Sequence, residues 1–185
     1  MYRLSVAQFE RMIDAGILTK YDRCELIRGE LIERPVVSDP HAAAVRRLNH
    51  RFNPPREEYI VSVRGAIKLK DSRPEPDLTL LHYKPDFYAS GTATPPDILL
   101  LIEVADSSLE FDRVVKRPLY AENGIQEYWI VNLIDDCIEV YRQPQPGGIY
   151  TEPRIAKRGE SIAILALPEL VVPVDDVLGR EPSSP

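Results

Sequence analysis

The chain has 185 residues, of which 44% are hydrophobic and 28% are charged, and this composition is that of an ordinary globular domain. It contains no run of 18 apolar residues that could span a membrane. Its amphipathic N-terminal segment carries acidic residues, so we expect neither a signal nor a transit peptide. The formal net charge of −6 argues against a non-specific nucleic-acid coat protein, although a local basic surface can still contact nucleic acid.

The two cysteines, Cys24 and Cys137, lie in apolar, strand-like segments without a second Cys or His at metal-ligand spacing. Free cysteines are commonly buried, and the cytoplasm keeps them reduced. We therefore expect two reduced core thiols and no zinc site. Because we expect no targeting segment, we also expect a cytoplasmic protein with no membrane partner and no organic cofactor.

Two segments near the N-terminus carry clear local signals. Residues 5–16 predict a helix, with Ser5 as its N-cap and Gln8 three positions later to complete a capping box. Residues 24–37 predict a β-hairpin that turns at residues 28–29, an Arg-Gly pair.

A second helix is predicted over residues 39–52. Asp39 suits its N-cap, Pro40 suits its first position, and the Pro-Pro pair at 54–55 would end it. Apolar and polar residues then alternate over 59–70 well enough to predict a strand.

The middle of the chain predicts two strands separated by a long loop. Residues 77–82 predict a strand, and residues 83–97 lack any period, so they predict a loop long enough to suggest function. Five apolar residues at 98–102 predict a buried strand. A helix follows over about 108–123 and ends at Gly124.

The rest of the chain completes a mixed fold. Residues 126–133 predict a buried strand that pairs with 137–143, and short strands and turns follow. The strand–helix–strand unit over 98–133 predicts a crossover between parallel strands. The fold class is therefore α/β or α+β, with a central mixed sheet flanked by helices. We expect one domain over residues 1–178 and a disordered tail over 179–185.

Three acidic residues, Glu25, Asp77 and Glu103, lie beside apolar residues that would draw them toward the core. An isolated buried carboxylate is costly or takes up a proton. A shared cation removes this cost, and carboxylate oxygens suit Mg²⁺ or Mn²⁺. The pattern therefore predicts a divalent metal site.

Asp112 and Lys116 are four residues apart on the helix that follows Glu103. Their plain interpretation is a surface ion pair worth at most about 0.5 kcal/mol. Because this helix follows Glu103 directly, its inner face can also return to the carboxylates, where an ammonium group can act on a water or a phosphate.

Three stretches carry a family resemblance: "EPD" at 75–77, "IEV" at 102–104 and "SSLEFDRVVKRPLYAENGIQEYWIVNL" at 107–133. Together they resemble the PD-(D/E)XK nuclease superfamily and, more narrowly, the bacterial Uma-type restriction endonuclease family. The resemblance covers roughly residues 20–178. It implies a restriction-endonuclease-like fold and Mg²⁺-dependent cleavage of DNA phosphodiester bonds.

The resemblance also implies a set of metal ligands. Asp77 matches the first metal carboxylate of the family and Glu103 matches the second. The backbone carbonyl of Val104 would be a further ligand. Glu25 matches the acidic residue that the family sets near the metals from its N-terminal part.

The chain departs from the superfamily pattern at one position. The motif has a lysine two residues after the second carboxylate, and Ala105 stands there. In Uma-type proteins this lysine lies on the following helix, which corresponds to Lys116 here. The implied role of Lys116 is to orient or help deprotonate the attacking water.

Other residues have two interpretations. His41 is either a phosphate contact or proton relay near the site or a local packing residue, and Gln126 is either a polar residue of the site or an ordinary strand residue. Tyr128 and Trp129 are more typical of a core. A basic rim that contacts DNA, or else a solvated surface, is formed by Arg46, Arg47, Arg64, Lys68 and Arg73.

These observations predict an Mg²⁺-dependent endodeoxyribonuclease that acts on DNA as a homodimer, since a symmetric dimer presents two sites to two strands. The alternative is a non-catalytic member of the same fold that binds nucleic acid or protein. A hydrolase of another phosphoester, such as RNA, also fits the pattern.

Overall fold

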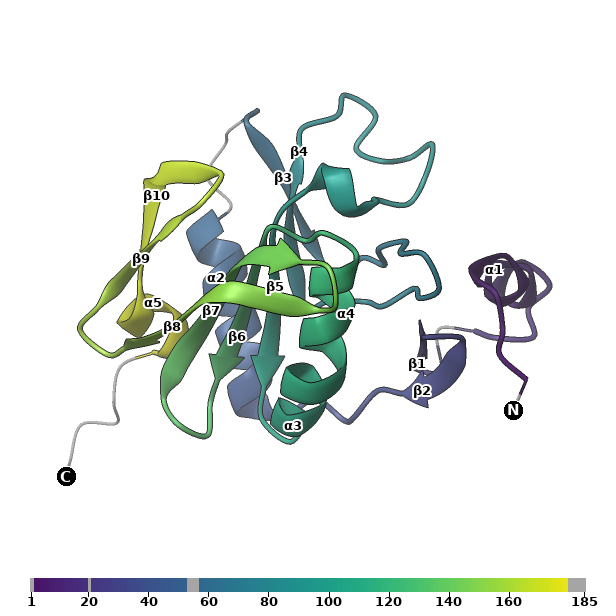
Figure 1. Cartoon of the computed structure of the whole chain (residues 1–185), viewed down its shortest axis with the longest axis horizontal. Coiled ribbons are helices and arrows are strands. Elements are labelled where there is room, and N and C mark those ends of the chain that lie inside the picture. The colour runs from purple at the N-terminus through teal and green to yellow at the C-terminus, as the bar shows by residue number, and fades with distance from the viewer. Residues whose placement is uncertain (1, 20, 53–56, 180–185) are drawn as a thin grey trace.

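A six-stranded sheet forms the centre of the computed structural model, which describes residues 2–19, 21–52 and 57–179 (Figure 1). The strand order is β3-β4-β5-β6-β7-β8. Strands β5 and β6 are parallel, and the other neighbours are antiparallel, so the predicted mixed sheet and its crossover are confirmed. The strands are β3 (Tyr59–Val63), β4 (Leu78–His82), β5 (Ile98–Ala105), β6 (Glu127–Asn132), β7 (Cys137–Gln145) and β8 (Ile149–Lys157). Within the described residues, no helix is long and apolar enough to cross a membrane.

Strand β5 supplies both faces of the core, because all eight of its residues are buried. Ile102 and the residues two positions before and after it pack in one cluster with helix α2 (Asp39–Phe52). Leu101 and Ala105 pack in a second cluster with the helical segment that joins β5 to β6. Side chains alternate between the faces of a strand, so Glu103 lies on the face of this second cluster.

The N-terminal helix and hairpin form as predicted and lie to one side of the sheet (Figure 1). Helix α1 (Val6–Asp14) has the expected capping box between Ser5 and Gln8. Strands β1 (Cys24–Ile27) and β2 (Glu30–Glu33) pair in an antiparallel hairpin. Cys24 is half-buried and Cys137 is buried, and both are free thiols, so only the second is a full core residue.

Helix α2 has a different cap from the one predicted. Its first turn is capped by Ser38, whose hydroxyl accepts a hydrogen bond from the His41 N–H at 3.3 Å. Ser38 also supplies a carbonyl to the Ala42 N–H at 3.0 Å. Asp39 therefore belongs to the helix rather than capping it. The predicted stop at 54–55 lies outside the described residues.

Strand β3 is shorter than predicted. It ends at Val63, and Arg64 has a left-handed φ of 53° that turns the chain out of the sheet. The predicted continuation to residue 70 is wrong. The alternating pattern arises because Ile67 and Leu69 bury their side chains in the second cluster from an irregular loop. The loop over 83–97 forms as predicted, apart from the turn η1 (Pro95–Asp97).

The helix predicted over 108–123 is interrupted. It consists of α3 (Leu109–Phe111), the π-helical turn η2 (Asp112–Lys116) and α4 (Arg117–Glu122). In the π turn, the Arg117 N–H donates to the carbonyl of Asp112, five residues earlier. A π turn inside an α-helix is frequently found at functional sites.

The C-terminal part adds a separate hairpin and a short helix. Strands β9 (Ser161–Ile164) and β10 (Leu167–Pro173) pair with each other, and helix α5 (Val174–Leu178) follows. Helix α5 packs against α2. We expected short strands and turns here, and a five-residue helix is too short to show a helical period. The predicted tail lies outside the described residues from residue 180 onward.

Candidate active site

A cleft of about 510 Å³ lies beside the C-terminal end of β5. One wall is the segment that leads from β2 to α2, and the other is the start of the helical segment after β5. The antiparallel register pairs Leu78 with Ile102, so Asp77, one residue earlier, lies opposite Glu103. The sheet therefore brings two predicted site residues to one edge of the cleft.

Lys116 lies in the middle of three carboxylates at the floor of this cleft. Its Nζ is 2.9 Å from Glu103 Oε1, 3.5 Å from Glu25 Oε2 and 3.9 Å from Asp112 Oδ1. The exposed fractions of the side chains are 9% for Lys116, 5% for Glu103, 3% for Glu25 and 2% for Asp112. Four charged groups from three separate parts of the sequence thus share one buried cluster.

One ammonium group does not balance three buried carboxylates. Burial raises the pKa of Glu103 to about 8, and the neighbouring carboxylates add to this rise while Lys116 opposes it. Burial likewise raises the pKa of Asp112 to about 6. For Lys116, burial acts to lower the pKa, but Glu103, Glu25 and Asp112 outweigh it and the net pKa is raised. The cluster thus has an excess of negative charge.

Tyr120 is a member of this cluster that sequence reasoning missed. Its hydroxyl donates a hydrogen bond of 2.7 Å to Glu103 Oε1, and the residue is completely buried. Burial and the adjacent Glu103 carboxylate raise the pKa of Tyr120 well above its usual value, so the hydroxyl stays a donor. The available signal was its position four residues after Lys116 on the same helical face.

Asp77 is held by a second set of contacts. Its Oδ2 accepts a hydrogen bond from the Val104 N–H at 2.9 Å and lies 2.9 Å from His41 Nε2. Arg64 Nε is 3.8 Å from Asp77 Oδ1. The structure therefore places His41 at the site and brings in Val104 through its amide. The predicted role of the Val104 carbonyl stays a prediction.

The donor chemistry suits a hard divalent cation. Among the residues that the structure describes, no group of three or more His, Cys, Asp or Glu side chains is placed to hold a metal ion as it stands. The cation that lies between Glu103, Glu25 and Asp112 is the ammonium group of Lys116. Glu103, Glu25 and Asp112 outnumber this ammonium group, and carboxylate oxygens are the donor type that Mg²⁺ and Mn²⁺ prefer.

Several predicted residues lie away from the cleft. Gln126 is exposed, hydrogen-bonds the Gly124 carbonyl and precedes β6, at the opposite end of the sheet from Glu103. Arg46 is an exposed residue of α2. Arg47 donates to the last carbonyls of α5, at 2.8 Å and 2.9 Å, and so stabilises that helix end.

The remaining basic candidates divide between two places. Lys68 and Arg73 both lie next to Glu10 of α1, at 2.9 Å and 3.8 Å, so they join the N-terminal helix to the loop after β3. Arg64 lines the cleft, and its predicted contact with DNA stays a prediction. Two arginines that sequence reasoning did not select, Arg23 and Arg34, also line it.

Comparison with known proteins places these features in a family. The family model Uma2, described as "Putative restriction endonuclease", matches residues 6–175. No curated protein matches the chain. A crystal structure of "a putative nuclease belonging to DUF820" from Anabaena variabilis has a similar fold, with a TM-score of 0.73 and 16% sequence identity over 95% of this chain and 97% of that chain. The chain therefore belongs to the Uma2 restriction endonuclease family, as its motifs around Asp77 and Glu103 predict.

Proposed function

We propose that this protein is a metal-dependent endonuclease that hydrolyses DNA phosphodiester bonds. One observation carries the proposal: Glu25, Glu103 and Lys116 meet at the floor of a cleft whose edge holds Asp77. These side chains come from β1, β5, the π turn and the residue before β4. Membership of a restriction endonuclease family supports the same activity.

The carboxylates of Asp77, Glu103 and Glu25, together with the Val104 carbonyl, are the groups that would hold Mg²⁺ or Mn²⁺. Such an ion would neutralise charge on a phosphate oxygen and make an attacking water more acidic. The chain itself prepares the ligands, because the Val104 N–H and His41 fix Asp77 while Tyr120 fixes Glu103.

Lys116 is the group that would act on the water or the phosphate. Its raised pKa keeps it a cation, so its role is electrostatic: it orients the water and stabilises the charge that develops on phosphate. Asp112 lies beside it and accepts a hydrogen bond of 2.7 Å from Ser108, which fixes its carboxylate at the cleft.

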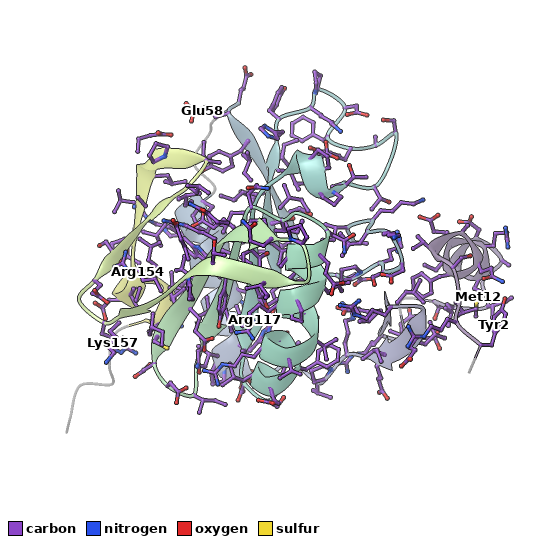
Figure 2. All side chains as sticks on the ribbon, viewed as in Figure 1. Tyr2, Met12, Glu58, Arg117, Arg154 and Lys157 are labelled. Atoms are coloured by element: carbon purple, nitrogen blue, oxygen red, sulfur yellow. The ribbon has the colours of Figure 1, made fainter. Side chains whose placement is uncertain are left out.

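The test is incubation of supercoiled plasmid, single-stranded DNA and RNA with the purified protein and Mn²⁺ or Mg²⁺. We expect the wild-type protein to cut DNA, and Asp77→Ala and Lys116→Ala to lose at least about 100-fold in rate. Lys157→Ala is the matched control, because Lys157 is exposed on β8 and is not among the residues that line the cleft (Figure 2). Equal cutting by all four proteins would indicate a contaminant and would overturn the proposal.

The other outcomes separate the remaining functions. Binding of DNA without any cutting, under both metals, would assign the non-catalytic role instead. Cutting of RNA but not of DNA would mean that the protein uses the same metal-dependent hydrolysis on RNA as its substrate. We further propose a homodimer, which light scattering on the eluted protein would detect as twice the chain mass.

A further inference from the structure

The π turn η2 lies between two carboxylates that belong to one row of the sheet. The register pairs Glu103 with Ile130 and Ile130 with Glu139, so the two carboxylates project from the same face of β5 and β7. They stand two strands apart, or about 10 Å. Lys116, at one end of the π turn, contacts Glu103, and Arg113, near its other end, contacts Glu139.

The Arg113–Glu139 contact is a multiply hydrogen-bonded ion pair. Arg113 Nε lies 3.1 Å and 3.2 Å from the two oxygens of Glu139, and its Nη2 also contacts Oε1. Glu139 is 3% exposed and accepts further hydrogen bonds from Tyr141 at 2.6 Å and Asn132 at 2.9 Å. A bidentate pair on a carboxylate fixed in this way has a defined geometry.

The π turn determines which helix residues face Glu103. In an unbroken α-helix, successive residues are rotated by about 100°, so residues eight apart differ by about 80°. Asp112 and Tyr120 are eight apart, with Lys116 between them, and all three side chains are buried against the carboxylate cluster. Successive residues of a π turn are rotated by a smaller angle than those of an α turn. The π turn therefore removes the difference in direction between Asp112 and Tyr120 and aligns the three side chains.

We propose that the Arg113–Glu139 ion pair holds the π turn in place and thereby positions Lys116 at the carboxylate cluster. Without this pair, the segment can relax toward ordinary α-helix, because a π turn is intrinsically rare. Lys116 then rotates away from Glu103 and Glu25. Arg113 is a positioning residue rather than a catalytic one. The catalytic consequence rests on the proposed nuclease function, whereas the change in the environment of Lys116 does not.

The first test follows Lys116 without any nuclease assay. Reductive methylation followed by mass spectrometry measures how accessible each lysine is in the folded protein. In Arg113→Ala, we expect the methylation rate of Lys116 to rise by about tenfold or more, since its side chain leaves a buried site. Two controls should leave Lys116 protected: Val114→Ala, at an exposed position in the same π turn, and Arg154→Ala, in an exposed ion pair on β8 (Figure 2).

The second test follows catalysis. The displacement of Lys116 from the carboxylate cluster should lower kcat by about 10- to 100-fold in Arg113→Ala with little change in KM. Arg113→Lys keeps one contact to Glu139 and should recover part of the rate, and it serves as the test variant where Arg113→Ala does not fold. Lys116 that stays as protected in both Arg113 variants as in Val114→Ala would overturn the inference. Exposed Lys116 in a protein without nuclease activity would keep the inference and reject only the proposed function.

Discussion

Tyr120 and Lys116 donate hydrogen bonds to the same oxygen of Glu103, at 2.7 Å and 2.9 Å. One donor is neutral and the other is charged, and both come from the helical segment that follows β5. The Glu103 carboxylate is thereby fixed in a buried position at the cleft. This arrangement makes Tyr120 the supporting residue on which the geometry of Glu103 depends.

Replacing Tyr120 by Phe should therefore destabilise the protein and disturb the site. The ring still fills its buried position, but Glu103 loses a donor, which costs about 1–3 kcal/mol. Urea unfolding should show a lower midpoint at an unchanged slope. Tyr150→Phe is the matched control, because Tyr150 is buried and donates to the Ile125 carbonyl at 2.9 Å. In the control we expect a smaller loss of unfolding free energy, about 1 kcal/mol, and no change in cleavage rate. Equal cleavage rates in Tyr120→Phe and Tyr150→Phe would contradict the role of Tyr120.

The stability of the protein should contain a component that falls as the pH rises. The pKa of Glu103 is raised from its usual value of 4.5 to about 8, so between these values the folded state binds more protons than the unfolded state. Stability from this group is fully present below pH 4.5 and is lost as the pH rises through about 8.

The measurement is the difference in unfolding free energy between the wild-type protein and Glu103→Gln across this pH range. The variant carries no titratable group at this position, so the wild-type protein should lose stability relative to it as the pH rises. A difference that does not vary with pH would show that Glu103 titrates normally. This difference cancels the contributions of other titratable groups to the pH dependence of stability. Glu139 is one of these, and because its pKa is lowered its contribution has the opposite sign.

Local sequence signals were sufficient for the elements that carry their own caps or breakers. The capping box at Ser5 defined α1, and the apolar run before Glu103 defined β5. The acidic residues followed from the cost of burying charge, and the structure brings Glu25, Glu103 and Lys116 together.

Other features of the fold and the site depend on tertiary packing and leave no signal in the local sequence. The spacing of Asp112 and Lys116 fits an α-helix equally well, so the π turn leaves no local signal. Gln126 follows a breaker and begins a predicted strand, but parallel pairing of β5 and β6 puts it at the end of the sheet opposite to the site. Which arginines face the cleft depends on the path of irregular segments such as the turn at Arg64.

Protons and divalent ions should compete for the carboxylate cluster. Because metal ligands must be deprotonated, the ion displaces the proton that Glu103 holds below about pH 8. We expect millimolar Mg²⁺ to raise the melting temperature more at pH 8.5 than at pH 6, by the usual linkage of ligand binding to stability. Glu103→Gln should abolish most of this gain, whereas Glu169→Gln, at an exposed position on β10, should keep it. A gain that is the same at both pH values would indicate that Mg²⁺ binds elsewhere.

Binding of DNA should itself require a divalent cation, before any cleavage. The lining of the cleft holds seven carboxylates and four cationic side chains: Glu25, Glu33, Glu75, Asp77, Glu103, Asp106 and Asp112 against Arg23, Arg34, Arg64 and Lys116. With all of these groups charged, the lining carries a net charge of −3, which repels a phosphate backbone.

Fluorescence anisotropy with a labelled oligonucleotide can measure this requirement, with Ca²⁺ as an ion that shares the oxygen ligands of Mg²⁺. We expect the Kd in EDTA to be at least about tenfold higher than in Ca²⁺, because each bound Ca²⁺ adds two positive charges and offsets most of the negative charge of the cleft. Arg64→Ala should weaken binding further and reduce its salt dependence, while Arg154→Ala, on the outer strand β8, should not. Equal affinity in EDTA and Ca²⁺ would mean that DNA binds outside this cleft, because the metal-free cleft has the wrong charge to hold it.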